Sequence, residues 1–117
     1  MYLNLRIQVR HMKWVCSICG MTIESDIKPL ACPLCGVNGD YIVLEKDFKG
    51  FPKKIKDKSK ENLNAALELE KNATINYFKY AKECEELGDK EVATLFTALA
   101  RVEAGHQQSI KKMLGTK

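Results

Sequence analysis

The sequence has no long apolar run. None of its hydrophobic stretches reaches the roughly 18 to 20 residues that a membrane-spanning helix needs. The N-terminus also lacks an apolar segment followed by small residues, which is the pattern of a cleaved secretion signal. We therefore expect a cytoplasmic protein that has no membrane partner.

The chain is also too short for a large core. The chain has 117 residues, of which 45% are hydrophobic and 29% charged, so it has room for one domain or two small ones. A disulfide framework is disfavoured, because the count of five cysteines is odd and four of them form Cys-x-x-Cys pairs. We expect reduced thiolates that bind a metal.

Those four cysteines form two short knuckles, Cys16-Ser-Ile-Cys19-Gly20 and Cys32-Pro-Leu-Cys35-Gly36. Two cysteines three positions apart in a tight turn place both sulfurs on one side of the loop, and the following glycine lets the backbone turn. Two such knuckles supply the four sulfurs of a tetrahedral metal site. The spacing predicts a four-thiolate site that holds iron or zinc, and a zinc ribbon whose metal only folds its segment is the simpler interpretation.

The chain divides into four parts on composition. Residues 1–11 form either an edge strand or an extension, because apolar and polar positions alternate over residues 3–9. Residues 12–48 make the cysteine ribbon, closed by a strand at 41–44. Residues 49–59 are rich in lysine and lack periodicity, so we interpret them as a linker without a nucleic-acid partner, although lysine runs can bind anionic partners. Residues 60–117 have a helical pattern.

Two helices are expected in that last part, one from about residue 60 to Gly88-Asp89 and one from about 90 to 114. Ser59 is a candidate cap for the first. The apolar face of the first helix is expected at Leu63, Leu67, Glu70, Ala73, Tyr77, Ala81, Cys84 and Leu87. That of the second is expected at Val92, Phe96, Leu99, Glu103, His106, Ile110 and Met113 or Leu114. The Gly88-Asp89 turn makes the pair a hairpin.

Three polar residues on these faces predict a second metal site. Glu103 and His106 are about 60° apart around one helix and ~4.5 Å along it, so both can reach one ion. Glu70 lies at about the same distance from the Gly88-Asp89 turn on the other helix, so it is expected beside them. The simpler alternative is that Glu70 pairs with a lysine and that His106 is a hydrogen-bonded core histidine. Carboxylates on an apolar face are costly unless a cation satisfies them, which favours metal.

One hairpin supplies two glutamates and one histidine, and two helices cannot bury their apolar stripe alone. Two hairpins packed as a four-helix bundle supply four glutamates and two histidines, which is the ligand set of carboxylate-bridged two-metal proteins. We therefore predict an α+β chain in which the metal ribbon precedes a helical hairpin, and a homodimer that completes a ferritin-like four-helix bundle.

Two runs of residues resemble known families. Trp14-Val15-Cys16, Pro29, Cys32-Pro33-Leu34-Cys35-Gly36-Val37 and Asp40-Tyr41 resemble rubredoxin. Asn62-Leu63, Glu70, Ala73, Tyr77, Phe96 and Glu103-x-x-His106 resemble the first helix pair of rubrerythrin, here after the rubredoxin-like part as in reverse rubrerythrins. The chain departs from the family in having one helix pair, and Ala73 stands where an extra glutamate occurs in the family's second pair.

The resemblance implies iron in the four-cysteine site and a di-iron site at the dimer interface. It also implies reduction of hydrogen peroxide, with hydrogen peroxide or oxygen as oxidant and a rubredoxin or its reductase as electron donor. Glu70, Glu103 and His106 would act at the di-iron site, and Tyr77 would hydrogen-bond a ligand carboxylate or intercept a radical. Two alternatives remain: an iron-oxidising ferritin-like protein, and a zinc-ribbon binding module with a helical dimerisation domain.

Overall fold

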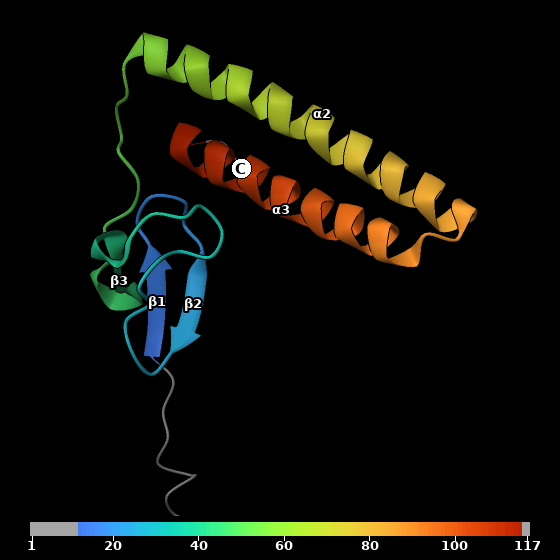
Figure 1. Cartoon of the computed structure of the whole chain (residues 1–117). Coiled ribbons are helices and arrows are strands. Elements are labelled where there is room, and N and C mark those ends of the chain that lie inside the picture. The colour runs from blue at the N-terminus through green and yellow to red at the C-terminus, as the bar shows by residue number, and fades with distance from the viewer. Residues whose placement is uncertain (1–11, 116–117) are drawn as a thin grey trace, which may run out of the picture. The chain divides into compact units, whose positions relative to one another are not determined.

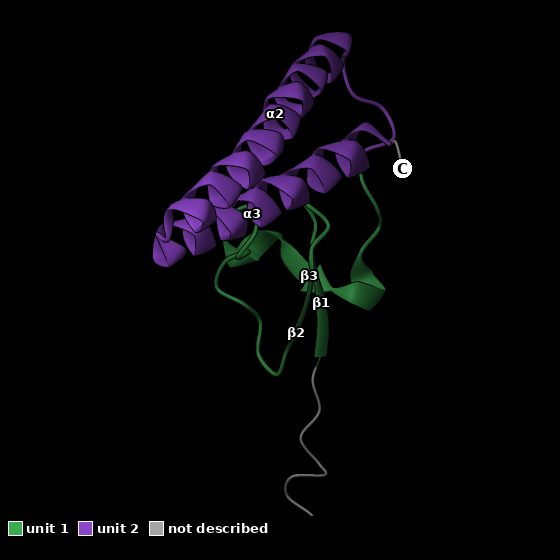
Figure 2. Ribbon diagram, turned by 90° about the vertical axis from the view of Figure 1, so that its right-hand side faces the viewer, with its two compact units in different colours: residues 1–51 green, residues 52–117 purple. Residues whose placement is uncertain are grey.

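The computed structural model describes residues 12–115, and the first predicted segment, 1–11, lies outside them. The chain separates into two compact units, residues 1–51 and residues 52–117 (Figure 2). The first holds a small sheet and the second two helices, which confirms the α+β class. Neither helix carries an apolar stretch long enough to cross a membrane.

The first unit is built on a three-stranded antiparallel sheet in the order β2-β1-β3, formed by β1 (Met12–Cys16), β2 (Thr22–Ser25) and β3 (Ile42–Leu44) (Figure 1). Two single 3₁₀ turns, η1 (Gly39–Tyr41) and η2 (Glu45–Asp47), flank β3. Strand β3 is the expected closing strand, shortened because Tyr41 ends η1. The register pairs Cys16 of β1 with Ile42 of β3, and the Ile42 side chain packs with the buried cysteines.

The core of this unit contains few residues. Its buried side chains are Val15, Cys16, Cys19, Cys32 and Ile42. Trp14 packs against the cysteine cluster, and its indole Nε1–H donates to the Ser25 carbonyl across β1 and β2 at 3.0 Å. Three of the five buried side chains are thiols, so the core of this unit is built around the cysteine cluster.

The second unit is a hairpin of α2 (Asp57–Leu87) and α3 (Lys90–Leu114) (Figure 1). Gly88 ends α2 with a φ of 87°, and its N–H and that of Asp89 satisfy the last carbonyls of the helix. The bounds of the second helix are confirmed. The first helix begins three residues earlier than expected, and Ser59 lies inside its first turn instead of capping it. An acidic residue, Asp57, stabilises the new first turn through the helix dipole.

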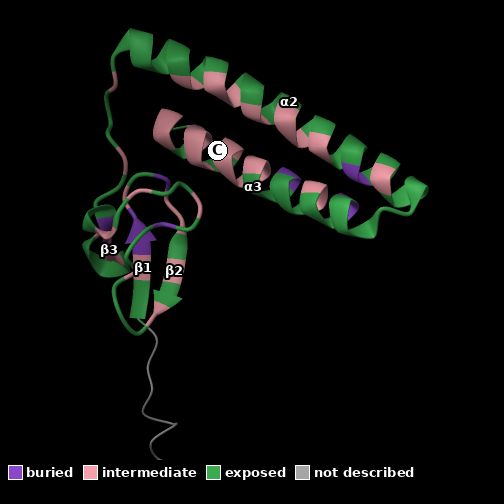
Figure 3. Cartoon of the chain, in the orientation of Figure 1, coloured by how far each residue is buried: buried purple, intermediate pink, exposed green. Residues whose placement is uncertain are grey.

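The contact between the helices differs from the predicted one. Its buried side chains are small ones, Ala81, Ala93 and Ala100, which let the two helices approach closely. Most of both helices is half-buried or exposed (Figure 3). Leu87 and Val92, which were expected to face inward, are 77% and 44% exposed, and Leu99 is 36% exposed. Those three predictions are wrong for the single hairpin, because alanines occupy the contact and the larger apolar side chains project beside it.

Candidate metal centres

The four cysteines that the spacing singled out converge in the first unit. The sulfurs of Cys16 and Cys35 are 3.6 Å apart, as are those of Cys19 and Cys32. All four sulfurs lie within 4.8 Å of one another. A tetrahedron with metal–sulfur bonds of ~2.3 Å has edges of about 3.8 Å. The cluster therefore already has the dimensions of a four-thiolate metal site.

The backbone of the two knuckles explains how they reach this geometry. Gly20 and Gly36 each have a φ of 82°, and their N–H groups donate to the carbonyls of Cys16 and Cys32 at 2.8 and 2.9 Å. A side chain is disfavoured at that φ, so glycine closes both turns. The two knuckles are local copies of one turn, and for this reason the sequence pattern predicted them reliably.

The thiols titrate differently because their surroundings differ. Burial raises the pKa of Cys19 to about 12. Partial burial also raises the pKa of Cys35. Burial acts in the same direction on Cys32, but hydrogen bonds from the backbone N–H groups of Cys35 and Leu34 outweigh it and lower the pKa of Cys32 to about 7. Without metal, the Cys32 thiol therefore loses its proton more readily than the thiols of Cys19 and Cys35.

Metal affinity at this site should rise steeply with pH. Metal binds thiolates, and the Cys19 and Cys35 thiols keep their protons above the pKa of Cys32 near 7, so at least two protons must leave. We expect the apparent zinc affinity to increase at least about 100-fold per pH unit between about pH 7 and pH 9, tenfold for each proton. Titration against a competing chelator measures this slope. Cys84→Ser is the control that should leave it unchanged, and a slope of one proton or less contradicts the assignment.

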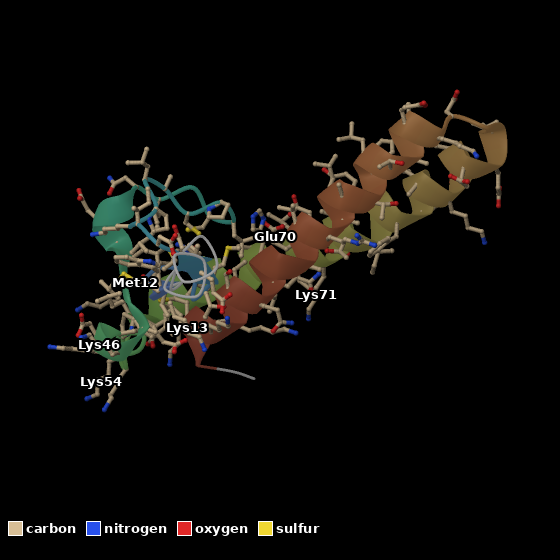
Figure 4. The ribbon with its side chains drawn as sticks, turned by 90° about the horizontal axis from the view of Figure 1, so that it is seen from below. Met12, Lys13, Lys46, Lys54, Glu70 and Lys71 are labelled. Atoms are coloured by element: carbon tan, nitrogen blue, oxygen red, sulfur yellow. The ribbon has the colours of Figure 1, made fainter. Side chains whose placement is uncertain are left out.

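The second cluster joins the two helices of the hairpin. His106 Nδ1 lies 3.5 Å from Glu70 Oε2 and 3.4 Å from Glu103 Oε2. One ligand atom from each residue lies within 4.8 Å of the others, and the three side chains are 21–30% exposed. Glu70 is marked in Figure 4, where the next residue, Lys71, points away from it. The structure thus brings together the three residues that the sequence analysis placed at one level.

The donor set of this cluster fits a metal ion. Oxygen Oε2 of Glu70 is buried and makes no hydrogen bond, although His106 is close to it. A buried carboxylate oxygen in that condition is costly, and a cation relieves the cost. Two carboxylates and an imidazole suit iron, manganese or zinc. Glu70 faces His106, so the alternative of a lysine partner gains no support from the described residues.

Two further polar residues at this level were not predicted. Gln107 Nε2 donates to Thr74 Oγ1 at 2.8 Å, which links α3 to α2 beside the cluster. Thr74 follows Glu70 by four residues, and Gln107 follows Glu103 by four, so this matched spacing was the signal that could have revealed them.

The described contacts of Tyr77 are aromatic. Its ring centroid lies 6.0 Å from that of Phe96 and 6.4 Å from that of Tyr80, and the Tyr80 and Phe96 centroids are 5.5 Å apart. This cluster occupies the next level of the hairpin towards its turn. Tyr77 therefore packs in an aromatic cluster that lies between Glu70 and the turn of the hairpin.

The first unit is a four-cysteine ribbon, and the second is a helical hairpin with a cluster of two glutamates and a histidine. This combination is typical of a class of protein that pairs a soft metal site with a harder one. Comparisons with known proteins agree. The family model for the rubredoxin-like domain of rubrerythrin matches residues 14–42, and the rubrerythrin family model matches residues 46–117. The chain belongs to the rubrerythrin family of non-haem iron proteins, and its rubredoxin-like part comes first.

One curated relative is Reverse rubrerythrin-1 of Clostridium acetobutylicum, which is 28% identical over 112 residues. The match covers 88% of this chain and 62% of the relative, so the chain spans less than two thirds of the length of that protein. No solved structure matches the chain significantly. The order of the two parts in this chain and the name of the relative confirm the predicted resemblance to reverse rubrerythrins.

Proposed function

We propose that this protein reduces hydrogen peroxide at a two-iron site shared by two copies of the chain, with electrons supplied through iron in the four-cysteine site. The observation that carries the proposal is the cluster of Glu70, Glu103 and His106 around a buried carboxylate oxygen that makes no hydrogen bond. One hairpin offers half of the ligand set that a carboxylate-bridged iron pair needs.

The exposed apolar side chains of α3 support a second copy as the source of the other half. Val92 and Leu99 lie about 20° and 40° from Glu103 around the helix and fall between Glu103 and His106. Leu95 and Val102, 56% and 42% exposed, widen the same stripe. This side of the hairpin therefore carries both metal ligands and exposed large apolar groups. A second hairpin packed against it would bury the stripe and bring two further glutamates and a histidine.

The side chains of this site would have different roles. Glu70 and Glu103 would hold and neutralise the cations, and His106 would supply a neutral nitrogen ligand. When bound, the iron pair would supply the two electrons that, with two protons, convert hydrogen peroxide to two molecules of water. Tyr77 would close the site on the side of the hairpin turn, where its ring packs against Phe96.

The four-cysteine site would act as the electron relay. A single ion held by four thiolates changes oxidation state with little rearrangement, and hydrogen bonds to the sulfurs adjust its potential. Cys35 is the exposed member of the four, whereas the other three are buried. An electron-donor protein such as a rubredoxin or its reductase would approach the Cys35 side.

Mixing anaerobically reduced, iron-loaded protein with stoichiometric peroxide tests the activity. Both iron signals should oxidise, and faster than free ferrous ion does. Glu103→Ala removes a ligand of the second site only, so it should abolish the fast reaction and leave the visible spectrum of the four-cysteine iron intact. Wild-type protein that oxidises no faster than free ferrous ion contradicts the proposal.

A further inference from the structure

The turn at Gly88 and the ring contacts of Phe96 hold the two helices in register on the turn side of the metal ligands. Ala81, Ala93 and Ala100 are the buried side chains of the contact, and small side chains allow close approach without strong interlocking. The metal ligands, however, come from both helices, and a binding site needs its groups placed within about 0.5 Å. A slip of one residue along a helix is ~1.5 Å. A hydrogen-bonded contact at the level of the ligands can refine the register to that precision.

The interaction between Thr74 and Gln107 is placed to do this. Gln107 Nε2 donates to Thr74 Oγ1 at 2.8 Å, and Thr74 Oγ1 donates in turn to the Glu70 carbonyl at 2.8 Å. Both hydrogen bonds are partly buried. Together they connect the residue that follows His106 to the backbone of Glu70. The two bonds therefore tie the ligands of α3 to the ligand of α2.

We propose that Thr74 and Gln107 are positioning residues that set the register of α2 against α3 for metal binding. Hydrogen bonds are directional and short, so they fix a relative position that an alanine contact leaves loosely determined. Polar side chains within an apolar helix contact have this effect in coiled coils, where one such residue can specify register. The inference rests on the proposed function, since it assumes that Glu70, Glu103 and His106 bind metal.

Cobalt binding to the hairpin tests the proposal without reference to activity. The full chain is first loaded with one zinc per chain, which fills the four-cysteine site and is spectroscopically silent, and Co²⁺ is then titrated. Thr74→Val keeps the shape of the side chain but removes the hydroxyl, and Gln107→Leu removes the amide. Each should weaken Co²⁺ binding about tenfold, in the range seen when groups that orient metal ligands are removed. The visible absorption band of the bound cobalt should also change.

Two variants separate positioning from general stability. Thr74→Ser restores the hydroxyl and should restore both affinity and spectrum. Thr97→Val is the matched control, because the Thr97 hydroxyl donates to the Ala93 carbonyl within α3 in the same way, at 3.0 Å. It should leave cobalt binding unchanged.

The possible outcomes are distinct. If the zinc-loaded wild type binds no cobalt, the proposed second site itself fails. If the wild type binds cobalt and Thr74→Val and Gln107→Leu match its affinity and spectrum, the positioning role is overturned while the proposed function stands. Equal losses in Thr97→Val and Thr74→Val also overturn it, because they indicate a general loosening of the helices.

Discussion

Replacing both Cys19 and Cys32 by serine should unfold the cysteine ribbon and leave the helical hairpin folded. Three of the five buried side chains in the first unit are cysteines, so the loss of the metal removes most of what holds this unit together. Structural four-ligand metal sites contribute on the order of 10 kcal/mol to folding, far more than so small an apolar core can supply. We expect no ordered sheet in this double variant.

Backbone NMR of the full chain measures this result directly. The amide signals of residues 12–47 should collapse to the shifts of an unfolded chain, while the helical circular dichroism of the hairpin persists. Cys84→Ser is the control, because Cys84 lies in α2 and outside the four-thiolate cluster. Dispersed ribbon signals in the double variant without metal would contradict the prediction.

Leu99→Asp should prevent formation of the proposed dimer and of the proposed second metal site together. Leu99 lies about 40° from Glu103 around α3, on the stripe that the second copy would cover. A carboxylate buried there without a partner costs several kcal/mol. Since each 1.4 kcal/mol is tenfold in affinity, association should weaken about 100-fold or more. The four-cysteine site, which is complete within one chain, should keep its metal.

Analytical ultracentrifugation and metal analysis on the same samples test this coupling. Ile75→Asp is the matched control: Ile75 is also an exposed apolar residue, at 66%, but it lies about 140° from Glu70 around α2. It should leave both the mass and the metal content unchanged. A Leu99→Asp protein that stays dimeric, or a monomeric wild type with a full second site, would show that the other half of the ligands does not come from a second copy.

The two sites differed in how much of them the sequence could predict. The cysteine site is made of two local turns, so spacing alone placed all four ligands. The grouping of Glu70 with Glu103 and His106 was predictable because the turn at Gly88 fixes the levels of both helices. Which side chains face the partner helix was harder, since periodicity identifies an apolar face but not what covers it.

Val92 and Leu99 illustrate that limit. Their positions correctly indicated an apolar side of α3, yet the single hairpin leaves them exposed and buries alanines instead. The contact between Thr74 and Gln107 was missed for a related reason, because it depends on how the helices are rotated against each other. The start of α2 at Asp57 shows that a lysine-rich segment without periodicity can still begin a helix.

The short turn at Gly88 also places a constraint on how this chain can evolve. Between Glu70 and Glu103 the residues are helical apart from Gly88 and Asp89. The number of residues between the two glutamates therefore determines whether their side chains meet. Deleting one residue within α3 ahead of Glu103 would turn Glu103 and His106 by about 100° around their helix and away from Glu70. Insertions and deletions in descendants of this sequence should therefore occur mainly in the lysine-rich segment. The number of residues between Glu70 and Glu103 should stay constant.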